Sequence, residues 1–229
     1  MGFFSKFFSK KKEAVPEIVI SPECKSLTDL RSLMDRLLSD ERYIAKSEYK
    51  QQMLNYQKTV EYFGVLISSG TLDDYCKKNG MPSNLAKETV SQYTTFESLI
   101  DRHNDEFLSR ALVSEKAYLD SILKSVDPKI LLDDDQRKVV LSDEDYTLVI
   151  AGAGAGKTTT VAAKVKYLVE KRGVSPEQIL VVSFTNKAVG ELKDKLNGKP
   201  FNLTTVFDLC AQEGGQAKLA KIIPIADVA

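Results

Sequence analysis

Hydrophobic residues in the first half of the chain recur at helical spacing. Between residues 26 and 38, and again from about 41 to 69, apolar side chains return every three or four positions, and Gly70 is placed to end the second run. A third run, residues 83–124, contains neither Gly nor Pro. These patterns predict a helical arm over residues 23–127, a long hairpin in which the second run pairs antiparallel with one very long helix or two nearly collinear ones.

The pattern changes after Asp127 to short apolar runs that alternate with helical patterns. The apolar runs are residues 146–150, 179–184 and 201–206. Nearly continuous apolar runs are typical of strands in a parallel sheet with both faces covered. The β-α-β-α-β order therefore predicts an open parallel sheet with right-handed crossovers over residues 128–229. The fold class expected from the whole chain is α/β, with the helical arm first.

Residues 1–22 differ from both parts and predict a basic aromatic tail and a linker. The first twelve residues contain four phenylalanines at helical spacing and four lysines, with no acidic residue. A basic aromatic helix is able to lie on a membrane surface or on nucleic acid, but a frayed or docked terminus is the simpler interpretation for so short a segment. Pro16 and Pro22 bracket a short β-like stretch and indicate a linker.

Composition narrows the classes of function. The formal net charge is zero, so a nucleic-acid partner has to be bound by a local surface. Cys24, Cys76 and Cys210 are far apart, which favours reduced thiols over a disulfide or zinc framework, and the single His103 is interpreted as a surface or helix-pairing residue. No apolar run approaches the ~18 residues that span a bilayer. We expect a cytoplasmic protein without a transmembrane segment.

The candidate chemistry lies directly after the first predicted strand. The residues there are Ala151, Gly152, Ala153, Gly154, Ala155, Gly156, Lys157, Thr158 and Thr159. Small residues let successive N–H groups point at one phosphate chain, and the helix that follows adds its positive N-terminal end. This is the Walker A pattern with Ala151 in place of the usual first Gly, and it predicts that the stretch binds ATP. Lys157 is expected to reach the β- and γ-phosphates and Thr158 to ligate Mg²⁺, which makes both candidate catalytic residues.

Three blocks of sequence together resemble a known family. Residues 132–137, 148–158 and 180–192 have the order and spacing of the glutamine motif, motif I and motif Ia of superfamily-one DNA helicases of the UvrD, Rep and helicase-IV kind. The resemblance implies that residues 128–229 are the N-terminal part of a RecA-like P-loop NTPase domain, from an ATP-dependent translocase on single-stranded DNA.

The same resemblance implies roles for individual residues. Gln136 is expected to hold the adenine, with its amide donor and acceptor facing the base. A loop expected to lie near the DNA consists of Phe184, Thr185, Asn186 and Lys187. Asn186 is also the candidate N-cap of the helix that follows. The alternative interpretation of the loop is that Phe184 belongs to the core and Lys187 is merely solvated.

The sequence departs from the family pattern at two places. Thr159 stands where known members carry an arginine that packs on adenine, so we expect the base to be held more loosely. After the third predicted strand, residues 205–208 replace the usual Thr-Phe-His, and the Walker B carboxylates and the second RecA-like domain are not found in the residues that follow. We therefore expect this chain to be the N-terminal portion of a helicase that is not catalytic alone.

Two classes of function follow from these observations. In the first, the chain is part of an enzyme, an ATP-dependent DNA helicase, and binds ATP–Mg²⁺ and single-stranded DNA. In the second, it is a non-enzymatic interaction module whose helical arm recruits a protein partner and whose phosphate loop is vestigial or regulatory. A measurement of nucleotide binding separates the two, because a vestigial loop need not bind.

Overall fold

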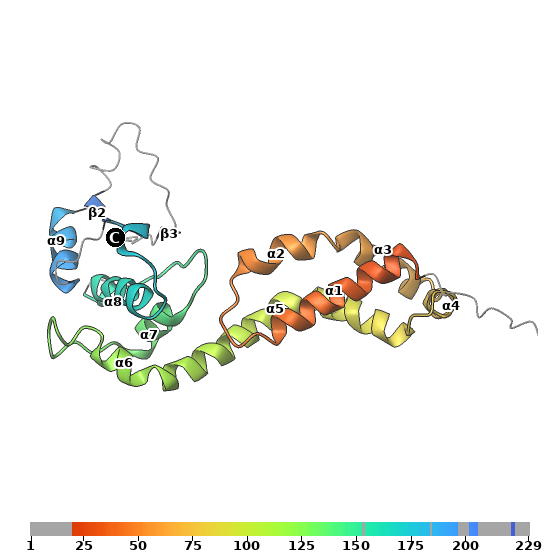
Figure 1. The fold of residues 1–229 in the computed structure, drawn as a ribbon, viewed down its shortest axis with the longest axis horizontal. Coiled ribbons are helices and arrows are strands. Elements are labelled where there is room, and N and C mark those ends of the chain that lie inside the picture. The colour runs from red at the N-terminus through yellow and green to blue at the C-terminus, as the bar shows by residue number, and fades with distance from the viewer. Residues whose placement is uncertain (1–19, 153, 184, 197–201, 206–220, 223–229) are drawn as a thin grey trace, which may run out of the picture. The chain divides into compact units, whose positions relative to one another are not determined.

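The computed structural model describes residues 20–222, except residues 153, 184, 197–201 and 206–220 (Figure 1). The described chain forms two compact units. The first unit comprises Met1–Asp35 and Met53–Thr95, and the second comprises Arg36–Gln52 and Phe96–Ala229. Of the basic aromatic tail and linker predicted over residues 1–22, residues 1–19 lie outside the described residues.

Helices account for most of the described chain. The helices are α1 (Pro22–Leu38), α2 (Lys46–Leu54), α3 (Gln57–Ser68), α4 (Leu72–Lys78), α5 (Ser83–Ser114), α6 (Lys116–Ser121), α7 (Asp134–Leu141), α8 (Lys157–Glu170) and α9 (Asn186–Lys195). The strands are β1 (Ile179–Ser183), β2 (Asn202–Thr205) and β3 (Lys221–Ile222), and a short 3-10 turn, η1 (Pro176–Gln178), leads into β1. None of the helices in the described ranges combines the length and the apolar character needed to cross a membrane.

The first unit is built from helices around an apolar core. Leu30, Met34 and Phe63 have no exposed surface, and the Phe63 ring meets the edge of Tyr75 with 5.9 Å between ring centroids. Cys24 and Cys76 are buried free thiols, while Cys210 lies outside the described residues. These contacts explain why the apolar positions of this region recur at helical spacing, since one face of each helix packs inward.

The predicted helical N-terminal region is confirmed, but the helix expected over residues 41–69 is wrong as a single element. It is divided into α2 and α3, and α2 begins only at Lys46. Residues before α2 are not helical because the Asn104 side chain, from α5, binds both main-chain groups of Ile44 at 2.9 Å. The main-chain groups of Ile44 are therefore already paired outside a helix.

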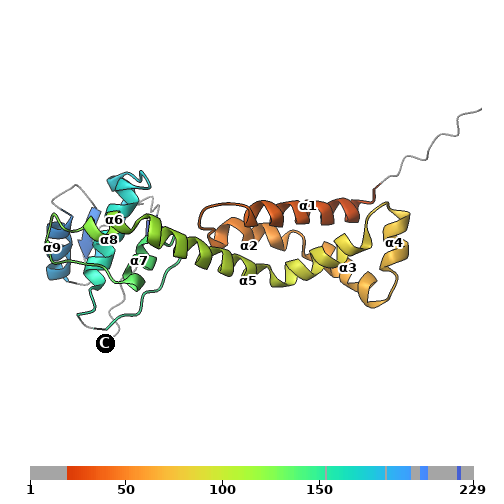
Figure 2. The same cartoon turned by 90° about the horizontal axis from the view of Figure 1, so that it is seen from below.

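The long helix expected from residue 83 is α5, which runs unbroken for 32 residues (Figure 2). It contacts α2 in both units. Within the second unit, the rings of Tyr49 and Phe96 meet edge to face with 5.6 Å between centroids. Within the first unit, the Tyr93 hydroxyl donates to the Met53 carbonyl oxygen at 3.3 Å. These side-chain contacts of the predicted hairpin therefore join α5 to α2.

The second unit contains a three-stranded parallel sheet in the order β2-β1-β3. Val181 of β1 is in register with Leu203 of β2, and Leu180 with Ile222 of β3. Burial alternates along β1, with Ile179 and Val181 almost fully buried and the residues between them half-buried. The second and third predicted strands are therefore present as β1 and β2, and α9 is the helix that connects them.

The first predicted strand is wrong in this structure. Residues 146–150 have no regular secondary structure and join no described strand, and the side chains of Tyr146, Leu148 and Ile150 are 94%, 71% and 79% exposed. The reason is topological, because β1 already pairs with β2 on one edge and with β3 on the other. The apolar residues that the pattern assigned to a buried strand instead face solvent.

Candidate nucleotide-binding site

The helix α7 positions Gln136, the residue expected to hold adenine. Asp133 is the N-cap of α7 and accepts a hydrogen bond from the main-chain N–H of Gln136 at 2.8 Å, while its own N–H donates to Gln136 Oε1 at 3.1 Å. This reciprocal pair is a capping box, which satisfies two main-chain donors at the start of the helix. The side chain of Gln136 is therefore held in place by the local sequence.

Two glycines of the predicted phosphate loop, residues 151–156, have a left-handed main-chain conformation. Gly154 and Gly156 have φ angles of +77° and +80°, in the left-handed region that disfavours residues with a side chain. Gly156 is the N-cap of α8, so the helix begins directly at Lys157. Gly156 has no side chain to cap α8, and the first N–H groups of the helix remain suited to an anion. Ala153 lies outside the described residues.

Lys157 folds back over the loop that precedes it. Its Nζ donates to the carbonyl oxygens of Ala151 and Gly152 at 3.1 and 3.2 Å. Thr158 and Thr159 follow in the first turn of α8 and are half-buried. The cation is thus positioned at the loop, bound to neutral acceptors that charged phosphate oxygens are able to replace.

The structure brings Gln136 to the same loop. Gln136 Nε2 donates to the Ala155 carbonyl oxygen at 3.1 Å. A Cβ atom built at Gly156 lies 2.7 Å from that Nε2, so a side chain at this position would displace the amide. Gln136 and the loop that ends at Gly156, which belong to separate blocks of the sequence, are therefore in contact.

Lys164 is a structural residue of this site that the sequence analysis missed. It is 7% exposed, and its Nζ donates to the carbonyl oxygens of Val140, at 2.8 Å, and Ser142. These carbonyls lie at the C-terminal end of α7, where a cation is favourable. Its position in the sequence could have indicated that it is buried, because Lys164 shares the face of α8 that carries the apolar residues Val161 and Leu168.

Arg137 joins α7 to α6 behind the site. It is 8% exposed and its guanidinium lies 2.5 Å from Asp120 Oδ1. Asp120 also binds Lys116 at 2.8 Å, and the hydrogen bond from Lys116 lowers the pKa of the Asp120 carboxyl. Arg137 Nε is buried without a hydrogen-bond partner among the described residues.

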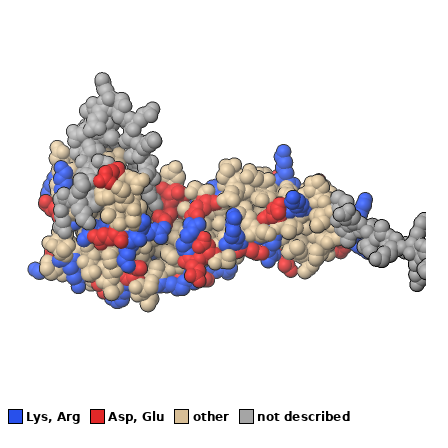
Figure 3. Space-filling view, in the orientation of Figure 1, with Lys and Arg blue, Asp and Glu red and all other residues tan. Residues whose placement is uncertain are grey.

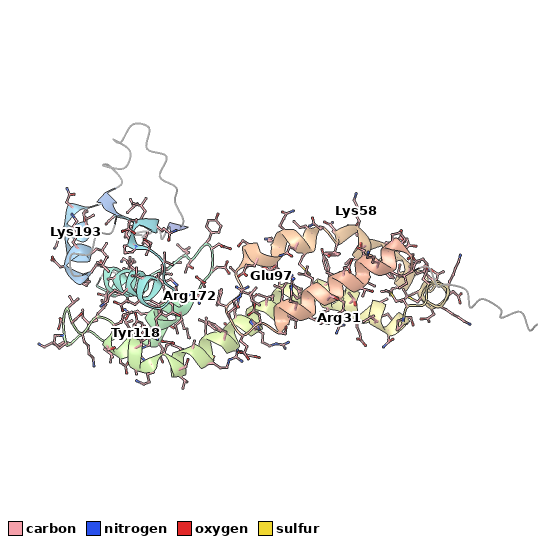
Figure 4. All side chains as sticks on the ribbon, viewed as in Figure 1. Arg31, Lys58, Glu97, Tyr118, Arg172 and Lys193 are labelled. Carbon is pink, nitrogen blue, oxygen red and sulfur yellow. The ribbon has the colours of Figure 1, made fainter. Side chains whose placement is uncertain are left out.

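A second cluster packs α6 against the C-terminal end of α8. The Tyr118 hydroxyl donates to Glu170 Oε2 at 2.9 Å, and Lys171 Nζ lies 4.8 Å from the Tyr118 ring centroid (Figure 4). Burial is the largest cause that raises the pKa of Tyr118. The helix α8 is therefore held by α6 at its C-terminal end, in addition to its contact with α7.

The residues expected to contact DNA lie at the start of α9, after β1. Thr185, Asn186 and Lys187 are exposed, and Phe184 is outside the described residues. The N-cap of α9 is Thr185, whose Oγ1 accepts from Ala188 N at 3.2 Å. The prediction of Asn186 as the cap is wrong by one residue, because the Thr185 backbone is extended and its hydroxyl reaches the N–H of the first turn.

Charge does not single out a nucleic-acid surface. On the face of the molecule shown in Figure 3, positive and negative side chains are interspersed rather than segregated. This arrangement agrees with the zero net charge of the chain. A nucleic-acid contact on this face would therefore depend on individual residues rather than on a broad basic field.

Comparison with known proteins finds relatives for part of the second unit. Residues 132–222 match the UvrD/REP helicase N-terminal domain family. The chain is 46% identical over 66 residues to a probable DNA helicase II homolog of Mycoplasma capricolum, covering 29% of this chain and 9% of that protein. It is 43% identical over 72 residues to the putative ATP-dependent DNA helicase YjcD of Bacillus subtilis, covering 31% and 10%.

A third relative, the ATP-dependent DNA helicase UvrD1 of Mycobacterium leprae, is 37% identical over 78 residues, covering 34% of this chain and 9% of that protein. The matched region thus spans about a tenth of the length of these curated relatives. No solved structure matches the chain significantly. The resemblance to UvrD-like helicases that the sequence predicted is confirmed for this part of the chain.

Proposed function

We propose that the chain, through the region that matches the UvrD/REP helicase N-terminal domain, binds ATP with Mg²⁺ and forms the first part of a helicase motor. The observation that carries the proposal is the local geometry of the loop. Two glycines with positive φ lead directly into the N-terminus of α8, and the first residue of that helix, Lys157, extends its ammonium over the loop. Such an arrangement is suited to a polyphosphate.

Each residue of the site has a role in this proposal. The N–H groups of residues 151–156 and of the first turn of α8 bind phosphate oxygens, and Lys157 exchanges its carbonyl partners for the β- and γ-phosphates. The hydroxyl of Thr158 is a ligand of Mg²⁺, and Thr159 lies beside it. Gln136, at the edge of the loop, offers its amide to the adenine.

The surrounding fold supports a RecA-like domain as the setting of this site. The strands β1 and β2 are parallel neighbours joined by α9, which is the unit from which such a sheet is built. The exposed residues Thr185, Asn186 and Lys187, with Phe184, are proposed to contact single-stranded DNA. A hydroxyl, an amide, a lysine and an aromatic ring suit a phosphate and a base.

Catalysis by the 229-residue chain is expected to be marginal. Phosphoryl transfer needs the metal to be held from both sides, a group that orients water and a cation on the developing charge, and Thr158 with Lys157 supplies only part of this set. Phosphate release should stay near background with and without single-stranded DNA. DNA-stimulated turnover that is lost in Lys157→Ala would contradict the expectation.

The alternative function, a module that binds a protein partner, is favoured by apolar side chains on the helical arm. Leu54, Tyr62 and Val65, in α2 and α3, are 51%, 40% and 65% exposed. Exposed apolar residues of this kind are common singly, so they support the alternative less strongly than the loop supports nucleotide binding.

Calorimetric titration with ATP–Mg²⁺ separates the two functions. The parent chain should bind, and Lys157→Ala should bind about tenfold more weakly or worse, because a charge-assisted hydrogen bond contributes ~1.5–3 kcal/mol. Lys138→Ala, which removes a half-exposed lysine from α7, is the matched control and should bind like the parent. Equal affinity of Lys157→Ala and the parent would reject the site.

A further inference from the structure

The side-chain amide of Gln136 connects two main-chain segments that are distant in sequence. Oε1 accepts from Asp133 N at 3.1 Å, and Nε2 donates to Ala155 O at 3.1 Å. One end of the amide is therefore fixed by the cap of α7, and the other binds the phosphate loop just before Gly156. A contact with the base explains neither bond, since both partners are main-chain groups of the protein.

We propose that Gln136 is a positioning residue for the phosphate loop, so that affinity for the polyphosphate itself depends on the Gln136 amide. The inference rests on the proposed nucleotide site and assigns Gln136 a role that does not require the base. Its physical basis is that the amide pairs a loop carbonyl and thereby restricts the loop to one conformation before the ligand arrives.

The close packing of the loop on the amide supports this role. The position of a Cβ atom at Gly156 is 2.7 Å from Gln136 Nε2, so the loop lies directly against the amide at the residue where α8 begins. A shift of the Gln136 amide therefore changes the contacts of Gly156, the N-cap that precedes the first N–H groups of α8.

The positioning role is compatible with a contact to adenine. A carboxamide has two N–H donors and two acceptor lone pairs, and the structure uses one of each on Ala155 and Asp133. No described residue is recorded as bonding the other donor and lone pair, which suit a base. Binding of the base and positioning of the loop are thus separable, and a ligand without a base isolates the second.

Calorimetry with Mg²⁺–tripolyphosphate, which has no base, tests the proposal. Gln136→Met keeps the length of the side chain but removes both bonds, and it should lower tripolyphosphate affinity about threefold to tenfold, the range expected of one neutral hydrogen bond. Asp133→Ala removes the side-chain cap of α7 while leaving the bond to Ala155. It should lower the melting temperature by a few degrees and leave tripolyphosphate affinity at the parent value.

The outcomes distinguish the two proposals. Unchanged tripolyphosphate affinity in Gln136→Met, with weakened ATP binding, would overturn the positioning role and leave the nucleotide site intact. An equal loss in Asp133→Ala and Gln136→Met would also overturn it, because the cap of α7 rather than the loop bond would then be responsible. Tripolyphosphate binding by Lys157→Ala at the parent affinity would overturn the nucleotide site and the positioning role together.

Discussion

The two sides of the phosphate loop have opposite environments, although residues 146–150 were expected to form a buried strand. Downstream, Ala162, Ala163 and Val165 of α8 have no exposed surface, whereas upstream Leu148 and Ile150 are 71% and 79% exposed. A helix satisfies its main chain internally, but a strand needs neighbours in the sheet. The geometry of the loop is therefore set by α8 and by the Gln136 amide of α7, and not by residues 146–150.

The largest expected difference between the two sides is in the free energy of unfolding, when Leu is replaced by Ala on each side of the loop. Leu168→Ala, at a residue of α8 that is 5% exposed, should reduce the free energy of unfolding by about 2–4 kcal/mol, because it leaves a cavity in a packed core. Leu148→Ala removes the same atoms upstream and should change it by less than about 0.5 kcal/mol.

Urea unfolding of the two variants checks this comparison. The exposed site serves as the control for the buried one, since the chemistry of the change is identical. Comparable destabilisation in both variants would mean that residues 146–150 are packed in solution, and that the two sides of the loop do not differ in burial.

A smaller effect is expected from the link that holds α8 to α7. Lys164→Met should destabilise the chain by about 1–3 kcal/mol, because the carbonyl oxygens of Val140 and Ser142 lose their donor in a buried position. Lys138→Met, at a half-exposed lysine of α7, is the control. A neutral or stabilising result for Lys164→Met in the same unfolding assay would show that the buried ammonium is not needed to join the helices.

The exposed upstream segment is expected to affect association more than stability. Residues 146–150 carry no charge and present three large apolar side chains, which is the composition of an edge that pairs with other chains. The purified chain should self-associate, and Leu148→Lys should shift it toward the monomer. Light scattering across a concentration series measures this, and a parent chain that stays monomeric throughout would contradict the prediction.

The features that the sequence predicted correctly depend on nearby residues. Gly154 and Gly156 take positive φ and α8 begins at Lys157 because these properties are set within a few positions of the chain. The capping box of α7 is equally local, although it was not predicted. Thr185 replaced Asn186 as the cap of α9, an error of one residue between two side chains that both cap helices well.

The features that were missed depend on contacts between distant residues. Asn104 fixes Ile44 across 60 positions and prevents the helix expected before Lys46. Lys164 reaches the end of α7, and no local pattern states that a buried lysine will find two carbonyls there. The pairing of β1 with both β2 and β3 left no free edge of β1 for residues 146–150, and strand order is not contained in the apolar pattern of any one strand.

Hydrogen exchange with and without ATP–Mg²⁺, read segment by segment, tests the central claim that the loop and α8 form a nucleotide site. Addition of nucleotide should slow the exchange of main-chain N–H groups over residues 152–159 and leave residues 146–150 unchanged, and the effect should be lost in Lys157→Ala. Unchanged exchange over residues 152–159 at saturating nucleotide, or equal protection in Lys157→Ala, would contradict it.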